Sequence, residues 1–172
     1  MTLAVGQKAT GFTLPDTEGR EHSLPAGQPA VVVFTCNHCP YALAWHDRIA
    51  QAARDYPDVP FFAINPNDAK RYPADSFDAM RERVERDGGW PLPYLRDESQ
   101  EVARAYGART TPHVFVLDAE GTVRYAGAPD ADYRDEGQEA RWLRQALDAV
   151  LAGAAPARSE TEPVGCSVKW RP

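Results

Sequence analysis

Residues 30–40 read AVVVFTCNHCP, an apolar run that leads directly into two cysteines three positions apart. The first six residues are mostly β-branched or aromatic, which is typical of a strand buried on both faces of a parallel sheet. Pro40 suits the first turn of a helix, because that position needs no N–H donor. Apolar residues then recur at helical spacing until Pro57 ends the helix. The sequence therefore predicts a C-x-x-C motif, Cys36 and Cys39, at a strand-to-helix turn.

The composition is that of an ordinary globular protein. The chain has 172 residues, enough for one domain with a substantial core, and 43% of them are hydrophobic. Its net charge of −6 argues against nonspecific binding to nucleic acid or to anionic membranes, since both require a basic surface. No signal-peptide pattern and no membrane-spanning segment is visible, so we expect a cytoplasmic protein. In a reducing cytosol a cysteine pair is more often catalytic, redox-sensing or metal-binding than structural.

The rest of the chain alternates predicted strands and helices. Residues 11–24 read as two short strands around a turn. Further strands are expected at 59–65, 113–118 and 122–127. Further helices are expected at 75–86, 98–106 and 136–151. Residues 154–163 read as a flexible linker, followed by the apolar anchors Val164, Val168 and Trp170.

A strand, a C-x-x-C motif, a helix, a parallel strand, a hairpin and a terminal helix together describe the thioredoxin fold. Pro112 begins a hairpin strand, where thioredoxin-like proteins place a cis-proline opposite the C-x-x-C motif. Because proline cannot normally begin a central strand, we predict that the Thr111–Pro112 bond is cis. The expected architecture is an α/β thioredoxin-like fold with an N-terminal β-hairpin and a central mixed sheet flanked by helices. It divides into a domain at 1–153 and a C-terminal tail at 154–172.

Several other stretches carry a wider pattern. They are VGQKATGFTLPDTEGREHSL, TCNHCPYALA, INPNDAKRYPADSFDAM, LPYLRDESQEVARAYGARTTPHVFVLD, YAGAPDADYRD and VGCSVKW. Together they resemble bacterial peroxiredoxin-like proteins of the thioredoxin family, within the alkyl hydroperoxide reductase/thiol-specific antioxidant superfamily. The resemblance covers nearly the whole chain and implies a thioredoxin fold with thiol redox chemistry.

Two features depart from the patterns of related proteins. A peroxiredoxin nucleophile follows P-x-x-x-T/S-x-x-C, but Val33 stands three residues before Cys36, and Cys36 itself stands three before Cys39. Thioredoxin carries a buried aspartate six residues before its first cysteine, and here that position is Ala30. The usual buried proton acceptor is therefore expected to be missing.

Thiol–disulfide exchange requires a thiolate. Cys36 is expected at the N-terminal end of a helix, where unpaired N–H groups and the macrodipole lower the pKa of a thiol. His38 adds positive charge if it is protonated, or it is an exposed spacer. On this interpretation Cys36 attacks a substrate disulfide and Cys39 resolves the mixed disulfide. The residues expected to support them are Thr35, His38, Pro40, Thr111 and Pro112.

Polar residues elsewhere leave alternatives open. Asn65, Asn67 and Asp68 form either a site rim or an ordinary turn, and the loop around Asp130 reads as solvated. Cys166 in the tail is a third redox cysteine, the site of an intermolecular disulfide, or a bystander, and the first reading is slightly favoured.

The leading hypothesis is a thiol–disulfide oxidoreductase that acts on protein or small-molecule thiols and disulfides, with an electron donor that the sequence does not name. One alternative is a thiol peroxidase with Cys36 as the peroxidatic cysteine. Another is a non-enzymatic protein that binds metal through its cysteines and a histidine. No cofactor or metal is expected for the leading hypothesis.

Overall fold

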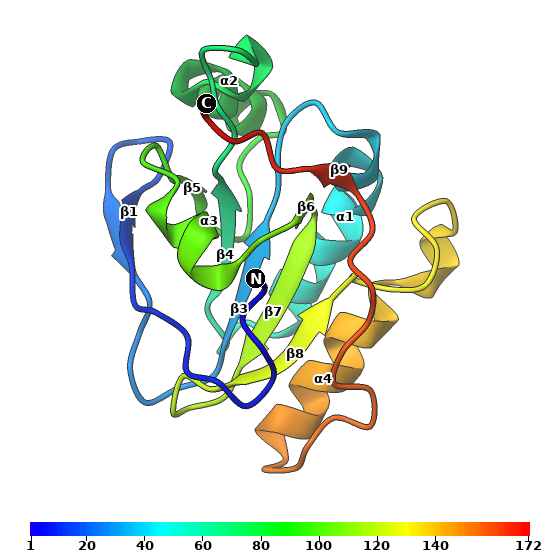
Figure 1. The fold of residues 1–172 in the computed structure, drawn as a ribbon. Coiled ribbons are helices and arrows are strands. Elements are labelled where there is room, and N and C mark those ends of the chain that lie inside the picture. Colours follow the sequence, from blue (N-terminus) through cyan, green and yellow to red (C-terminus); the bar gives the residue numbers. More distant parts are fainter.

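The computed structural model describes residues 1–172 and is built around a mixed sheet of five strands, ordered β5-β4-β3-β7-β8 (Figure 1). Its strands are β3 (Ala30–Phe34), β4 (Phe61–Asn65), β5 (Tyr94–Arg96), β7 (His113–Leu117) and β8 (Val123–Gly127). The pairs β3–β4 and β4–β5 are parallel, whereas β7 is antiparallel to both β3 and β8. This is the central mixed sheet that the sequence predicts.

Helices cover both faces of the sheet. They are α1 (Pro40–Asp55), α2 (Phe77–Arg86), α3 (Glu101–Tyr106) and α4 (Arg141–Leu151), with short 3-10 turns at η1 (Pro73–Asp75) and η2 (Glu136–Gln138). Because side chains alternate along a strand, Val31 and Val33 of β3 face α1 and α4, whereas Val32 and Phe34 face α3. None of the helices combines the length and apolar character that a transmembrane helix requires.

The N-terminal hairpin forms where the sequence predicts it, whereas the last helix begins later than predicted. β1 (Thr13–Pro15) and β2 (Glu21–Ser23) pair antiparallel as expected. The last helix begins at Arg141 and not at Glu136, because Glu139 and Ala140 both adopt positive φ angles. Such a left-handed backbone cannot continue a right-handed helix, so η2 and α4 are separate elements.

The tail, residues 154–172, lies along the edge of the sheet and across its top (Figure 1). Thr161 anchors the first half: its N–H donates to the carbonyl of Ala126 (3.1 Å), and its hydroxyl accepts from the N–H of Ala128 (2.9 Å). The expectation of a flexible linker at 154–163 is therefore wrong, since its backbone continues the hydrogen bonding of β8.

The second half of the tail forms a strand of its own. β9 (Cys166–Ser167) pairs antiparallel with β6 (Thr110–Thr111), in the loop that precedes Pro112. Val168 is 4% exposed and Trp170 packs against the same core cluster, whereas Val164 is exposed. Two of the three predicted anchors thus hold the tail, and Val164 is not one of them.

Candidate functional site

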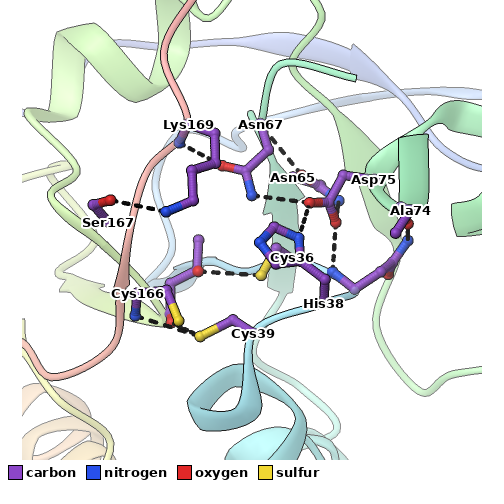
Figure 2. Close-up of polar contacts among 12 residues, drawn as sticks. Cys36, His38, Cys39, Asn65, Asn67, Ala74, Asp75, Cys166, Ser167 and Lys169 are labelled. Atoms are coloured by element: carbon purple, nitrogen blue, oxygen red, sulfur yellow. Dashed lines mark hydrogen bonds and ion pairs between the residues drawn. The ribbon is translucent and has the colours of Figure 1, made fainter. Parts of the chain in front are cut away.

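The C-x-x-C motif lies at the carboxyl end of β3, where the chain turns into α1. Cys36 follows the strand by two residues, and Cys39 is the N-cap of α1. Both side chains are fully buried, and all three cysteines of the chain are free thiols. The two motif cysteines and Cys166 gather at one place (Figure 2), although the third lies more than 120 residues away in the sequence.

The loop before Pro112 faces the two motif cysteines. The Thr111–Pro112 peptide bond is cis, which agrees with the prediction from sequence. The hydroxyl oxygen of Thr111 lies 3.2 Å from the Cys36 sulfur. The sulfur of Cys39 lies 3.2 Å from the carbonyl oxygen of Thr111. Thr111 therefore contacts both sulfurs through different atoms.

Two flanking residues act through the backbone. The N–H of Thr35 donates to the carbonyl of Ile64 (2.8 Å), which continues the pairing of β3 with β4 up to the motif. Pro40 is the first residue of α1, the position predicted for it. Both residues therefore help to fix the turn that carries the motif.

The pKa values of the two motif cysteines shift in opposite directions. The pKa of Cys39 is lowered to about 4 by the thiol hydrogen bond from Cys36, with further donation from the N–H groups of Ala42 and Cys166. The pKa of Cys36 is raised, first by that same hydrogen bond, then by burial and by the charge of Asp75. The predicted low pKa of Cys36 is wrong, because the neighbouring Cys39, burial and the charge of Asp75 all raise it.

His38 is hydrogen-bonded to a buried carboxylate. Its Nδ1 contacts Asp75, and its ring stacks on Tyr72 with a centroid separation of 5.5 Å and an interplanar angle of 10°. The His38 ring is therefore not an exposed spacer, because it is held by Asp75 and Tyr72. The charge that bears on Cys36 is the carboxylate of Asp75.

Asp75 is the residue that the sequence analysis missed. It is fully buried in η1, and four donors converge on its two oxygens (Figure 2). Oδ1 accepts from the Asn37 N–H (2.6 Å) and the Asn65 amide (3.1 Å). Oδ2 accepts from the Asn67 amide (3.0 Å) and contacts His38. Asn65 and Asn67 are therefore part of the site, and the polar run after β4 was the only sequence signal for it.

Two further residues hold the C-x-x-C turn in place. Arg83 of α2 donates to the carbonyl of Cys36 (3.0 Å) and to the side-chain oxygen of Asn37 (2.9 Å). The hydroxyl of Tyr94 donates to the same Asn37 oxygen at 2.7 Å. The backbone between the two cysteines is thus braced by side chains from α2 and β5.

The same neighbourhood contains three groups of the kind that bind metals. Ligand atoms of Cys36, His38 and Asp75 all lie within 4.8 Å of one another. However, each carboxylate oxygen of Asp75 already accepts two donors, which occupies the lone pairs that a cation would need. The donor set therefore fits a buried hydrogen-bonded anion better than a metal centre.

Cys166 approaches the motif from the tail. Its N–H lies 3.4 Å from the Cys39 sulfur, and its thiol is partly exposed. Burial raises the pKa of Cys166 to about 11, and the neighbouring Cys39 thiolate adds to the effect. The structure thus places the backbone N–H of Cys166 against the Cys39 sulfur.

Comparisons with known proteins match most of the chain. The profile of the AhpC/TSA family matches residues 5–126. Thiol-disulfide oxidoreductase ResA from Geobacillus thermodenitrificans is 28% identical over 127 residues, which make up 71% of this chain and 68% of that protein. A crystal structure of an uncharacterized conserved protein from Geobacillus kaustophilus is 36% identical, with a TM-score of 0.91 over 98% of this chain and 93% of the other. A secreted disulfide oxidoreductase from Mycobacterium tuberculosis, 24% identical, shares the fold with a TM-score of 0.56 over 65% of this chain and 79% of its own.

Proposed function

The chain belongs to the AhpC/TSA family, as its sequence resemblance predicts. We propose that it is a thiol–disulfide oxidoreductase that uses Cys36 and Cys39 as its redox-active pair. A relative that bears that name, thiol-disulfide oxidoreductase ResA, matches over about two thirds of each protein. The observation that carries the proposal is the contact of both sulfurs with Thr111, next to the cis-proline. Its substrates are proteins or small molecules that carry thiols or disulfides.

The reaction moves two electrons and two protons. In the reducing direction the Cys36–Cys39 dithiol becomes a disulfide, and one substrate disulfide becomes two thiols. The attacking group must be a thiolate, and the lowered pKa of Cys39 supplies one at neutral pH. Cys36, whose thiol hydrogen-bonds to Cys39, then suits the resolving role. This reverses the roles that the sequence alone suggests.

The direction of the reaction depends on the reduction potential of the pair. Equilibration of the protein with glutathione buffers of defined ratio, followed by thiol trapping, measures it. A potential near that of thioredoxin, about −270 mV, supports a reductase, whereas a potential near about −120 mV supports an oxidase. Serine variants of Cys36 and Cys39 should each abolish turnover of a disulfide substrate. Full activity in either variant would refute the proposal.

A peroxidase function has one observation in its favour. The Thr111 hydroxyl beside Cys36 supplies the kind of group that Val33 cannot provide. The raised pKa of Cys36 argues against it, since a peroxidatic cysteine acts as a thiolate. Rapid consumption of hydrogen peroxide by a Cys39→Ser variant, with none by Cys36→Ser, would favour the peroxidase.

A further inference from the structure

One partly exposed cysteine packs against the buried cysteine pair. Cys36, Cys39 and Ala42 form a small cluster that is completely shielded from solvent. The partly buried residues that cover this cluster are Tyr41 and Cys166. Cys166 is the partly exposed cysteine of this group, and Figure 2 shows it beside Cys39.

The position of Cys166 is fixed by backbone pairing. β9 pairs with β6 so that Cys166 lies opposite Thr111, the residue before the cis-proline. The N–H of Val168 also donates to the carbonyl of Arg109 (3.1 Å). Gly165 packs so closely on this loop that a Cβ there would lie 2.2 Å from the Thr111 carbonyl oxygen. The tail therefore packs against the cis-proline loop so closely that residue 165 has no room for a side chain.

Side chains of the domain hold the tail beyond Cys166. The Asn67 side-chain oxygen accepts from the N–H of Lys169 (2.9 Å), and its amide donates to Asp75. Gln100 donates to the carbonyl of Lys169 (2.9 Å) and accepts from the N–H of Arg171 (3.0 Å). Asn67 therefore joins the tail directly to the buried carboxylate beside Cys36.

We propose that Cys166 is a third redox cysteine, which exchanges directly with Cys39 and carries electrons between the buried Cys36–Cys39 pair and disulfides in solution. The proposal rests on the proposed thiol–disulfide oxidoreductase function and adds the route by which substrate reaches it. The contact that carries it is the approach of Cys166 to the Cys39 sulfur, together with the burial of the other two thiols.

The exchange proceeds in three balanced steps. The Cys166 sulfur attacks a substrate disulfide and forms a mixed disulfide, and the proton of the Cys166 thiol passes to the first substrate thiolate that leaves. The Cys39 thiolate then attacks the Cys166 sulfur, forms a Cys39–Cys166 disulfide and releases the second substrate thiolate. Finally the Cys36 sulfur attacks the Cys39 sulfur, which closes the Cys36–Cys39 disulfide, and the Cys36 proton passes to the Cys166 thiolate that leaves. Each step is a displacement at sulfur, so no reductant other than the dithiol is consumed.

The docked tail also bears on the class of substrate. An extended polypeptide would bind a thioredoxin-like site by adding a strand beside Thr111, but β9 already occupies the hydrogen-bonding groups of β6. A small disulfide needs only the exposed sulfur of Cys166. The relay therefore favours compact disulfides of the glutathione type over extended polypeptide segments.

The test follows the oxidation of the reduced full-length chain by oxidised glutathione. Trypsin separates the cysteines, because Cys36 and Cys39 fall in peptide 21–48 and Cys166 in peptide 159–169. In C36S the last step is blocked, so these two peptides should be recovered linked by a Cys39–Cys166 disulfide. In C166S the Cys36–Cys39 disulfide should form about tenfold more slowly or worse, while its amount at equilibrium stays the same.

A matched control keeps a thiol in the tail but places it on the side of β9 that faces away from Cys39. In the double variant C166S/S167C the thiol moves to the neighbouring position of β9, whose side chain points to the opposite side of the strand. It should be as slow as C166S. Recovery of the wild-type rate in this variant would contradict the relay, because a tail thiol in any orientation would then suffice.

The outcomes separate the two proposals. If the wild type and C166S form the Cys36–Cys39 disulfide at the same rate, Cys166 is a bystander. That result refutes the relay but leaves the proposed function intact. If the wild type forms no such disulfide under any glutathione ratio, the proposed function fails and the relay fails with it. Disulfide-linked dimers through Cys166, seen as doubled mass without reductant, would also contradict the relay.

Discussion

Gly165 lies so close to Thr111 that a side chain on residue 165 would overlap the carbonyl oxygen, at 2.2 Å from its Cβ. The obstructing atoms belong to the backbone of the cis-proline loop, so they cannot move aside without distorting that loop. We predict that Gly165→Ala displaces β9 and destabilises the protein by about 1–3 kcal/mol, as overpacking does. Denaturant unfolding measures the free energy. Alkylation of peptide 21–48 should also become faster, since the displaced tail uncovers Cys36 and Cys39.

Gly11→Ala is the matched control for this change. A Cβ on Gly11 meets nothing within 4 Å, and its backbone φ is one that other residues adopt readily. It should leave both the unfolding free energy and the alkylation rate at wild-type values. Equal behaviour of the two alanine variants would show that the tail does not depend on its close approach to the loop.

The lowered pKa of Cys39 gives a prediction about pH. The ultraviolet absorbance of thiolates in the reduced wild type should rise through a step near pH 4, the pKa to which Cys39 is lowered. Cys36→Ala removes the thiol that donates to Cys39, which is the largest cause of the shift, so the step should move to higher pH. A step that survives Cys39→Ser and disappears in Cys36→Ser would place the thiolate on Cys36 instead.

The reactivity of Cys166 should follow the opposite course. Its pKa is raised to about 11, first by burial and then by Cys39, so alkylation of peptide 159–169 by iodoacetamide should accelerate up to that pH. Cys39→Ser removes the neighbouring thiolate, and the midpoint should fall, with burial keeping it above the ordinary value. N-acetylcysteine titrated in parallel corrects for the reagent. An unchanged midpoint in Cys39→Ser would mean that the two thiols do not interact.

The strands and the C-x-x-C turn could be predicted because their signals are local. The run from Ala30 to Phe34 is apolar without interruption, and each of these residues is buried in β3. Pro40 marks the helix start for a reason confined to its own ring. The cis bond before Pro112 also has a local signal, since a proline there opens a central strand.

The roles of polar residues could not be predicted, because they depend on partners distant in the sequence. Asp130 reads as part of a solvated loop, yet it is buried, paired with Arg48 at 2.9 Å and bonded to the Trp45 indole at 2.8 Å. Asp75 likewise begins a charged segment, but η1 brings it against the C-x-x-C turn. A carboxylate looks exposed in a sequence until the donors that surround it are known.

The expected lack of a buried carboxylate beside the first cysteine is corrected for the same reason. Ala30 does occupy the position that is aspartate in thioredoxin, but Asp75 reaches the neighbourhood of Cys36 from another element and raises the pKa of that thiol. A comparison by position within the strand cannot find Asp75, because Asp75 lies in η1, 45 positions after Ala30.

The four donors around Asp75 lead to the last prediction. Asp75→Asn replaces an oxygen acceptor by an amide donor, which then faces the donors of Asn67 or Asn65. We expect a loss of about 3 kcal/mol in unfolding free energy, because buried donors lose their partner. The pKa of Cys36 should also fall, since the Asp75 charge is one of the causes that raise it. Denaturant unfolding and thiolate absorbance of a Cys39→Ser background measure the two effects.

Asp78→Asn provides the control for the change at Asp75. Asp78 lies one turn away at the start of α2, its side chain is 76% exposed, and its ion pair with Arg81 lies at the surface. Its substitution should change the unfolding free energy by less than about 0.5 kcal/mol and leave Cys36 unaffected. If Asp75→Asn proves as stable as Asp78→Asn, the hydrogen bonds to Asp75 do not hold the C-x-x-C turn, and the buried carboxylate has no structural part in the site.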